Sequence, residues 1–319
     1  MHLRFKIVSL IGIFTFLVQH KSVAQQSAQD TTFISRDLAI NEFVNGTLVK
    51  PSSDSIRVPL VIFVMGQGLT DRNGNQSHSK NNAFKHLALE LSKKGVASFR
   101  YDKRIFNKRV SELQIRFDDF IDDAIAAIEY FILEPQYTKI IVAGHDQGSL
   151  IGMVATQDRA DAFISIAGAS QTVDKMIVDQ LQRQAPGLVY NAKLAFRQLT
   201  EMGKARNYSE ALSMIFRPDM QQFMRSWMLF DPVEELQKID VPVLILQGDR
   251  DMQIDVEEAK ILVESTPFAK YVEIKDMNHY LKEIKGTDLE NQKSYNEPNR
   301  PVIPEAVQVI ADFAKEEKL

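Results

Sequence analysis

The chain has 319 residues, of which 45% are hydrophobic and 25% are charged, with a formal net charge of −4 and a pI of about 5.9. This apolar content excludes a disordered protein, and the acidic balance excludes the basic surface that nucleic-acid binding needs. There is no cysteine to form a disulfide, and the six histidines form no metal-binding motif, so we expect neither a metal nor a cofactor.

Residues 1–24 have the pattern of a secretory signal peptide. Arg4 and Lys6 precede an apolar run from Ile7 to Val18, and Ser22-Val23-Ala24 offers small residues for cleavage. The run is too short to cross a bilayer, which takes about 20 apolar residues. We therefore expect an exported protein, periplasmic or secreted, without a stable membrane anchor once the signal is removed. A retained N-terminal anchor is the alternative.

Beyond the signal, short apolar runs typical of strands alternate with segments of helical periodicity. The expected strands are 33–39, 43–49, 60–65, 96–100, 139–143, 162–167, 241–246 and 271–274, and the expected helices are 83–94, 117–133, 147–156, 255–265 and 304–315. The first two strands favour an antiparallel pair. The later strands are continuous apolar runs, as in buried parallel sheets. The alternation predicts an α/β fold with a mostly parallel sheet and helices on both faces.

This alternation stops between Ser170 and Asp231. Segments 180–184, 192–199 and 209–216 have helical character there, and no segment has the pattern of a strand. A structureless detour of that length is unusual, so we expect residues 170–231 to form a helical cap inserted into a core of residues 25–169 and 232–319. An ordinary pair of surface helices is the alternative. The polar segment 285–300 is expected to be a surface loop.

The most informative segment, Gly144-His-Asp-Gln-Gly148, lies between an expected strand and an expected helix. A turn of this form is the nucleophile elbow of α/β-hydrolases, which usually reads Gly-x-Ser-x-Gly. The two glycines allow the strained turn and the close approach of strand and helix. Asp146 stands at the apex, so the nucleophile position holds a carboxylate where a hydroxyl is usual.

An acid and a histidine follow the elbow in the chain order of such enzymes. Asp251 comes just after strand 241–246, with Asp249 as the second candidate, and His279 follows strand 271–274. In this order the carboxylate orients the imidazole, which acts as the general base.

The oxyanion hole is expected to consist of two backbone N–H groups. One is that of Gln147, directly after the apex, and the other is that of Gln67, with Gly68 as the alternative, after strand 60–65.

With these motifs, nearly the whole chain after residue 24 resembles the exported α/β-hydrolases of the dienelactone-hydrolase-like and bacterial esterase group. The resemblance rests on residues 67–75, 100–104, 144–148, 247–251 and 277–279, and on 216–218 and 226–232 at the cap and its exit. It implies carboxylesterase activity on a small-molecule substrate. The group carries Ser at position 146 and often a small Ser at position 67, and this chain departs at both.

Three hypotheses follow from Asp146. The first is a hydrolase with an ester-type pocket and an Asp146-Asp251-His279 triad. The second is an epoxide hydrolase or haloalkane dehalogenase, whose elbows resemble Gly-His-Asp-x-Gly and which would form an alkyl ester on Asp146. The third is a catalytically silenced binding protein with the same fold. For the second, Tyr190 or Tyr208 of the cap could protonate an opening epoxide, and Trp227 could line the pocket. The sequence does not indicate the oligomeric state.

Other polar residues have structural interpretations. Asp118 or Asp119 is expected to be a charge favoured by a helix N-terminus. For Asp102 we expect a salt bridge with Lys103 or Arg104. Asp71 and Arg72 either shape the oxyanion loop or pair with each other. Ser149 is expected to point away from the turn and not to replace the nucleophile.

Overall fold

The computed structural model describes residues 32–52, 57–106 and 115–316. The predicted signal peptide, and the N-terminal anchor that is its alternative, lie outside these residues. Within the described ranges, none of the helices combines the length and apolar character that a bilayer crossing requires.

A single eight-stranded sheet forms the centre of the described chain, with strand order β1-β2-β4-β3-β5-β6-β7-β8. The strands are β1 (Phe33–Ala39), β2 (Asn45–Pro51), β3 (Val58–Val64), β4 (Ala97–Asp102), β5 (Tyr137–His145), β6 (Ala162–Ile166), β7 (Val243–Gly248) and β8 (Lys270–Ile274). β2 pairs antiparallel with both β1 and β4. The remaining neighbours in the sheet, β4-β3-β5-β6-β7-β8, pair parallel. The expected strands are therefore found, with ends that differ by up to two residues.

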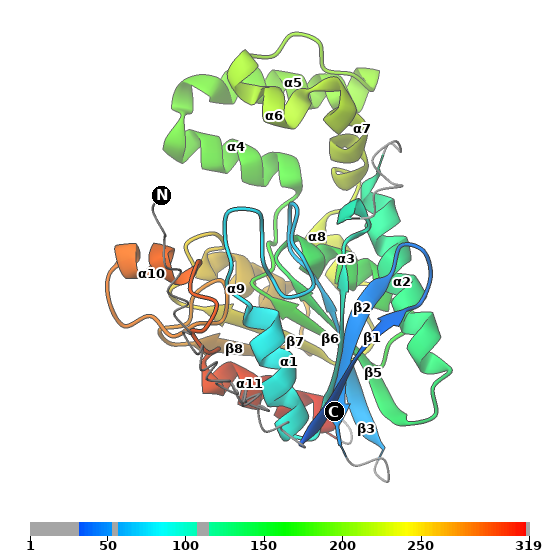
Figure 1. The fold of residues 1–319 in the computed structure, drawn as a ribbon. Coiled ribbons are helices and arrows are strands. Elements are labelled where there is room, and N and C mark those ends of the chain that lie inside the picture. Colours follow the sequence, from blue (N-terminus) through cyan, green and yellow to red (C-terminus); the bar gives the residue numbers. More distant parts are fainter. Residues whose placement is uncertain (1–31, 53–56, 107–114, 317–319) are drawn as a thin grey trace, which may run out of the picture. The chain divides into compact units, whose positions relative to one another are not determined.

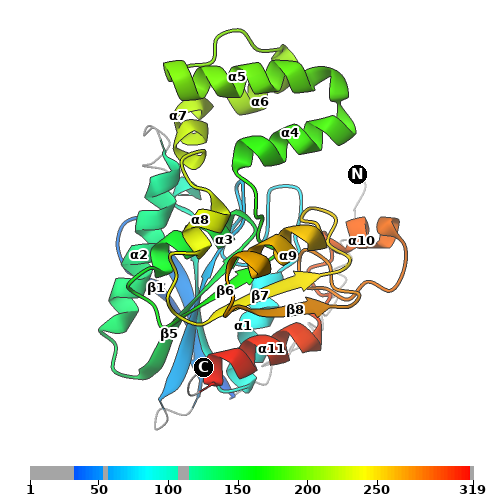
Figure 2. The same ribbon diagram turned by 180° about the vertical axis from the view of Figure 1, so that it is seen from behind.

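Helices cover both faces of the sheet (Figures 1 and 2). One face packs on α1 (Ala83–Lys93) and α11 (Pro304–Lys315), and the other on α2 (Phe117–Ile132), α3 (Gln147–Thr156), α8 (Pro232–Leu236) and α9 (Val256–Ser265). Successive strand residues face opposite sides of the sheet, so Ile62 packs on the side of α2 and α3, while Val61 and Phe63 pack on the side of α1 and α11. The predicted α/β fold class is confirmed.

Between β6 and α8 the chain forms a group of helices beyond the carboxyl ends of the parallel strands (Figure 1). These are α4 (Val173–Gln184), α5 (Val189–Met202), α6 (Ser213–Phe216) and α7 (Pro218–Trp227), with single 3-10 turns at Pro186–Leu188 and Glu210–Leu212. They fall within the segment predicted to be a cap. The expected helical segments cover parts of α4 and α5, and segment 209–216 covers the turn Glu210–Leu212 and α6, whereas α7 was not expected.

The prediction of a surface loop at 285–300 is wrong, because this segment contains α10 (Asp288–Ser294). Two of its polar residues, Asn291 and Ser294, are buried and have hydrogen-bond partners. Asn278 donates from Nδ2 to Asn291 Oδ1 at 3.0 Å and to Ser294 Oγ at 2.8 Å. Thr287 Oγ1 accepts the N–H of Glu290 at the start of the helix. The other residues of α10 are mostly exposed, so the segment does lie at the surface, but it is a helix and not a loop. Buried polar side chains need hydrogen-bond partners, and polarity alone does not show whether such partners exist.

Candidate active site

The elbow between β5 and α3 holds Asp146 in a strained conformation, with φ 52° and ψ −121°. Its two glycines are required by close contacts. A Cβ on Gly144 would lie 2.1 Å from the carbonyl oxygen of Gly148, and a Cβ on Gly148 would lie 2.1 Å from that of Val64. The backbone of the turn is fixed by the N–H of Asp146, which donates to Ile166 O at 3.0 Å. Side chains larger than hydrogen are thus excluded at both glycines.

The structure brings Asp251 and His279 together at the carboxyl edge of the sheet. His279 Nδ1 lies 2.8 Å from Asp251 Oδ2, and both side chains are buried. The backbone N–H groups of Gln253 and Ile254 donate to Asp251 Oδ1. Burial would raise the pKa of Asp251, but His279 and these N–H groups hold it below its ordinary value. Asp249, the second candidate, instead accepts the N–H of Asp276.

His279 carries a proton more readily than an isolated imidazole. Burial alone would lower its pKa, but the charge and hydrogen bond of Asp251, followed by the charge of Asp146, raise it. His145 of the elbow supports the same loop, with its Nε2 2.9 Å from the carbonyl oxygen of His279. Burial lowers the pKa of His145 to about 3, so this ring is neutral and serves as a structural link. Its part in holding His279 was not predicted.

Asp146 places one carboxylate oxygen against the predicted oxyanion hole. The backbone N–H of Gln67 donates to Asp146 Oδ2 at 2.9 Å. The N–H of Gln147 begins α3, where the first N–H groups of a helix have no partner within the helix. Of the two donors considered after β3, Gln67 makes this contact. Burial raises the pKa of Asp146, although His279, the N–H of Gln67 and Lys103 each oppose the rise.

The sequence did not indicate Lys103, a buried lysine beside the elbow. It is 5% exposed, and its Nζ donates to Gly66 O and to Gln147 Oε1, both at 2.8 Å. The ammonium also lies 4.7 Å from the ring centroid of Phe120. Burial lowers its pKa to about 7, although Asp146 opposes the shift. Its position directly after β4, next to the strand that precedes Gln67, is the signal that could have found it.

The expected salt bridge of Asp102 with Lys103 or Arg104 is wrong. Asp102 accepts from Arg72, whose Nη2 lies 2.6 Å from its Oδ2. Successive residues at a strand end point to opposite sides, so Asp102 and Lys103 face different neighbours. Arg72 therefore does not pair with Asp71, which instead accepts backbone N–H groups within its own loop, from Asn73 and Asn75.

Two further polar residues behave as expected. Asp119 accepts the backbone N–H of Arg116 at the start of α2, which places its charge at the helix N-terminus. Ser149 is buried, with its Oγ 2.7 Å from Ser165 Oγ, and does not point into the cavity at the elbow.

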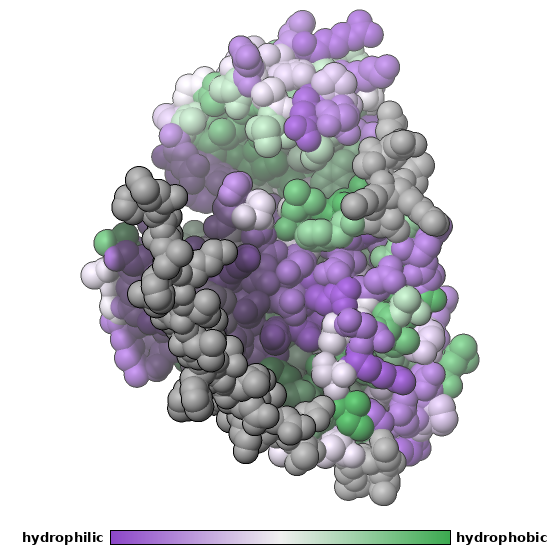
Figure 3. All heavy atoms as spheres, viewed as in Figure 1, coloured by the Kyte–Doolittle hydropathy of each residue, from purple (hydrophilic) through white to green (hydrophobic). Residues whose placement is uncertain are grey.

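A cavity of about 760 Å³ lies between the loop after β3 and the helices α6 and α7. Its polar lining consists of Gln67, Lys103, Gln147, Arg217 and Asp219. The apolar side chains that line it are more numerous, and they are Leu69, Ile105, Ile115, Phe120, Met214, Met220, Phe223, Met224 and Trp227. Figure 3 shows hydrophobic side chains gathered where the helices between β6 and α8 face the rest of the described chain. Trp227 lines the cavity as proposed. The suggestion for Tyr190 and Tyr208 is wrong, because Tyr190 is 79% exposed, Tyr208 packs against Phe216, and neither lines the cavity.

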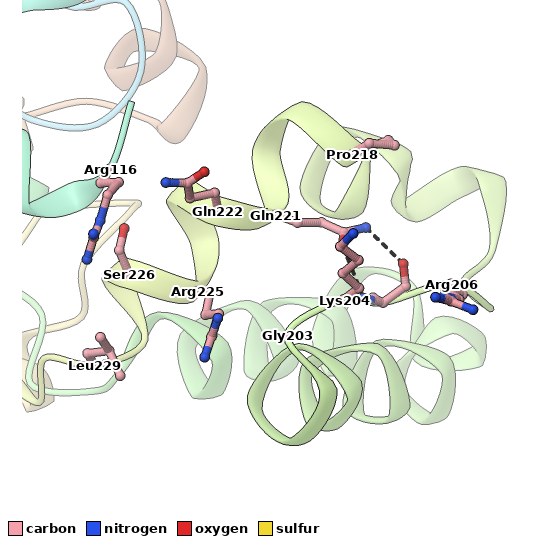
Figure 4. A pocket seen from close by; sticks show the side chains of 11 residues that line it. Arg116, Gly203, Lys204, Arg206, Pro218, Gln221, Gln222, Arg225, Ser226 and Leu229 are labelled. Carbon is pink, nitrogen blue, oxygen red and sulfur yellow. Dashed lines mark hydrogen bonds between the residues drawn. The ribbon is translucent and has the colours of Figure 1, made fainter. Parts of the chain in front are cut away.

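A second cavity of about 780 Å³ lies on the other face of α7 (Figure 4). Its lining includes four cationic side chains, those of Arg116, Lys204, Arg206 and Arg225. None of Asp146, Asp251 and His279 lines either of these two cavities. Asp146 lines a small cavity of about 20 Å³ together with Gln147 and Trp227. Gln147 and Trp227 also line the first cavity, which is therefore the candidate substrate pocket.

Comparison with protein families gives a match over residues 73–283 to the hydrolase family described as serine aminopeptidase, S33. The chain belongs to this family. It is thus a member of a hydrolase family, although the apex of its elbow carries Asp146 and not serine.

Two curated relatives are similar in sequence. Esterase EstD from Thermotoga maritima is 24% identical over 270 residues, which are 82% of this chain and 64% of the relative. The probable aminopeptidase YbaC from Bacillus subtilis is 24% identical over 123 residues, covering 37% of this chain and 36% of YbaC. The chain thus spans less than two thirds of the length of either relative.

Solved structures with the same fold include Est1E from Butyrivibrio proteoclasticus, with a TM-score of 0.54 and 17% identity, covering 88% of this chain and 96% of Est1E. An acylaminoacyl peptidase from Pyrococcus horikoshii has a TM-score of 0.53 and 15% identity, covering 90% of this chain and 42% of the peptidase. At these identities the likeness establishes the fold alone.

Proposed function

We propose that the protein hydrolyses small, largely apolar substrates through a covalent ester formed on Asp146. The observation that carries this proposal is the 2.9 Å contact between the N–H of Gln67 and Asp146 Oδ2. In a serine enzyme the oxyanion hole is filled by the substrate's carbonyl oxygen. Here Oδ2 of Asp146 accepts the hydrogen bond from the N–H of Gln67. This is expected if the carboxyl carbon of Asp146 itself becomes the tetrahedral centre.

The first step needs no base, because a carboxylate is already a nucleophile. Asp146 Oδ1 attacks the electrophilic carbon, the bond from that carbon to the leaving group breaks, and the leaving group takes the electron pair. An alkyl ester of Asp146 results. No side chain with a hydrogen bond to Oδ1 occurs in the described ranges, which is compatible with attack from this oxygen.

The second step uses the pair of Asp251 and His279. His279 removes a proton from water, and the hydroxide attacks the carboxyl carbon of Asp146. The negative charge then develops on Oδ2, where the N–H groups of Gln67 and Gln147 stabilise it. Collapse of this intermediate breaks the bond to the alkyl oxygen, the alcohol leaves with the proton from His279, and the carboxylate is regenerated. The 2.8 Å contact of His279 with Asp251 supports the role of base.

The geometry favours a substrate attacked at a saturated carbon, such as an alkyl halide or an epoxide. Such a substrate has no carbonyl oxygen that must compete with Asp146 Oδ2 for the N–H of Gln67. The apolar lining of the 760 Å³ cavity suits a hydrophobic group of moderate size. With no cap tyrosine in the lining, an alkyl halide, whose leaving group needs no proton, fits better than an epoxide.

The second candidate is a carboxylic ester, which the relationship to Esterase EstD favours. Attack by Asp146 on the ester carbonyl would give a mixed anhydride. The raised pKa of His279 supports this route, since a protonated imidazole can give its proton to the departing alkoxide. Water activated by the neutral imidazole would then hydrolyse the anhydride.

The decisive experiment is turnover in ¹⁸O-labelled water, followed by mass analysis of the peptide that contains Asp146. Substrates are 1-haloalkanes, styrene oxide and short-chain p-nitrophenyl esters. We expect ¹⁸O in the carboxyl group of Asp146 after turnover, and no turnover by Asp146→Asn. The substrate class that is turned over distinguishes the alkyl from the acyl route.

Asp146→Ser tests the silenced-protein hypothesis. If the unmodified protein turns over none of these substrates while Asp146→Ser cleaves p-nitrophenyl esters, the carboxylate has silenced an esterase site and the covalent role of Asp146 is wrong.

We also propose that the protein is exported, and that it acts in the periplasm or outside the cell. Support comes from the charge and hydropathy pattern of residues 1–24.

A further inference from the structure

We propose that Lys103 is a positioning residue for the oxyanion hole, acting on both of its donors without touching the reacting atoms. The inference deepens the proposed function and rests on it only for the identity of the reaction. Nothing in the sequence motifs assigns a role to this lysine.

Lys103 and Asp146 bind opposite ends of the peptide group that joins Gly66 to Gln67. Lys103 Nζ donates to the carbonyl oxygen of Gly66 at 2.8 Å, and the N–H of Gln67 donates to Asp146 Oδ2 at 2.9 Å. In a trans peptide the C=O and N–H point in opposite directions. An ammonium on the carbonyl side therefore polarises the N–H on the other side, and the two hydrogen bonds strengthen each other.

The second donor is tied to the same ammonium through a side chain. Lys103 Nζ donates to Oε1 of Gln147, whose backbone N–H is the other predicted donor of the hole. One cation thus connects the loop after β3 with the start of α3. Both contacts fix the spacing of two N–H groups that belong to segments 80 residues apart along the chain.

The burial of Lys103 costs free energy, which indicates that this side chain has a role beyond filling space. A buried ammonium costs free energy, and among the described residues no carboxylate lies within ion-pair distance to compensate it. The charged residues next to Lys103 in sequence pair with other partners. Asp102 binds Arg72, and Arg104 binds Asp119 and Asp123. The charged group that acts on Lys103 is Asp146 on the elbow. A methionine would fill the same volume without this cost.

Gly66 shows how close the packing of this peptide is. A Cβ at position 66 would lie 2.9 Å from Asp146 Oδ2 and 3.2 Å from Asp146 Cβ. The peptide therefore has little room to tilt, and the hydrogen bond from Lys103 determines its orientation from the side that Asp146 does not contact.

The test is the pH titration of the Gln67 backbone amide by ¹H–¹⁵N NMR on the unmodified protein. Because burial lowers the pKa of Lys103 to about 7, we expect the Gln67 resonance to shift upfield with a midpoint near pH 7 as the ammonium loses its proton. Lys103→Met should abolish this step, and Lys103→Arg should remove the step while keeping the low-pH position. Asp146→Asn should lower the midpoint, because Asp146 supports the charge on Lys103.

Lys282→Met is the matched control. Lys282 is also buried, and its Nζ also donates to two oxygens, which here are the backbone carbonyl oxygens of Ser294 and Glu297. This variant should leave the Gln67 titration in place. A Gln67 amide that does not titrate near pH 7 in the unmodified protein, or that titrates unchanged in Lys103→Met, overturns the proposal.

Kinetics gives the second measurement. Lys103→Met should lower kcat by roughly 10- to 100-fold, less than the 10²- to 10³-fold loss for removing a whole donor, with KM nearly unchanged. If KM instead rises by roughly 10- to 100-fold while kcat stays unchanged, Lys103 only shapes the pocket and the proposal is wrong. The NMR titration needs no turnover, so failure of the proposed reaction and failure of this proposal are distinguishable.

Discussion

At the scale of single residues, the site depends on how burial and nearby charges set the pKa values of Asp146 and His279. Both have raised pKa values, Asp146 because it is buried, and His279 because the carboxylates of Asp251 and Asp146 outweigh its burial. In the proposed reaction Asp146 must be deprotonated for the first step, and the imidazole of His279 must be neutral for the second. This division of roles leads to two predictions.

Replacing His279 should separate the two steps. In His279→Asn the carboxylate of Asp146 still attacks, but no base activates water, so the covalent intermediate should accumulate. Intact-protein mass spectrometry after incubation with a turned-over substrate should show an increase equal to the transferred group. The double variant with Asp146→Asn should show none. Turnover at the normal rate by His279→Asn would contradict the assigned role.

The acidic limb of activity should lie above the ordinary range of an aspartate. The folded pKa of Asp146 is raised from 3.8, so its carboxylate form, and with it kcat/KM, is lost as the pH falls through that higher value. The charge of Lys103 lowers this pKa, so Lys103→Met should move the limb to still higher pH. Rates measured from about pH 4 to pH 8 test both statements. A limb at the ordinary aspartate pKa in both proteins would contradict them.

At the scale of elements, the site depends on how β4 is joined to α2. Directly after Lys103, the 3-10 turn η1 (Arg104–Phe106) begins, and Arg104 binds two carboxylates of α2. Its Nη1 lies 2.8 Å from Asp119 Oδ1, and its Nη2 lies 2.8 Å from Asp123 Oδ1, with the Asp123 side chain 2% exposed. This pairing fixes the chain that carries Lys103 against the helix that carries Phe120.

Arg104→Met should therefore destabilise the protein by about 3 kcal/mol, because it leaves a buried charge at Asp123 without a partner. Urea unfolding measures the change. Adding Asp123→Leu to Arg104→Met should recover much of the loss, since the uncompensated charge is then gone. A loss below about 1 kcal/mol in the single variant would mean that Asp123 is protonated or hydrated in the folded protein.

At the scale of the whole molecule, the residues proposed to act in catalysis lie at the edge of the sheet, and α6 and α7 provide more than half of the apolar side chains that line the candidate pocket. α7 forms a wall between two cavities, one containing Lys103 and Gln147 and the other lined by cationic side chains. Cavity shape is thus decided mainly outside the sheet. Substitutions at Phe223 or Met220 are expected to change which substrates fit, without changing the catalytic groups.

Export is the second property at this scale. If residues 1–24 are a signal peptide, the protein expressed with its full chain in a bacterial host should accumulate outside the cytoplasm and begin at Gln25. N-terminal sequencing of the protein from the periplasmic fraction or the medium tests this. Replacing Arg4 and Lys6 with Glu should retain it in the cytoplasm. A protein that keeps residue 1 in the membrane fraction would favour the retained anchor.

The sequence by itself determined the fold class, the elbow and the positions of Asp251 and His279. Apolar periodicity records which residues are buried, and parallel strands bring their carboxyl ends to one edge of the sheet. Only the tertiary structure decided that Asp146 Oδ2 meets the N–H of Gln67, that Lys103 binds the Gly66 carbonyl, and that Tyr190 lies outside the pocket. These contacts join segments far apart in the chain, and a local pattern cannot specify which side chain reaches which partner across such a distance.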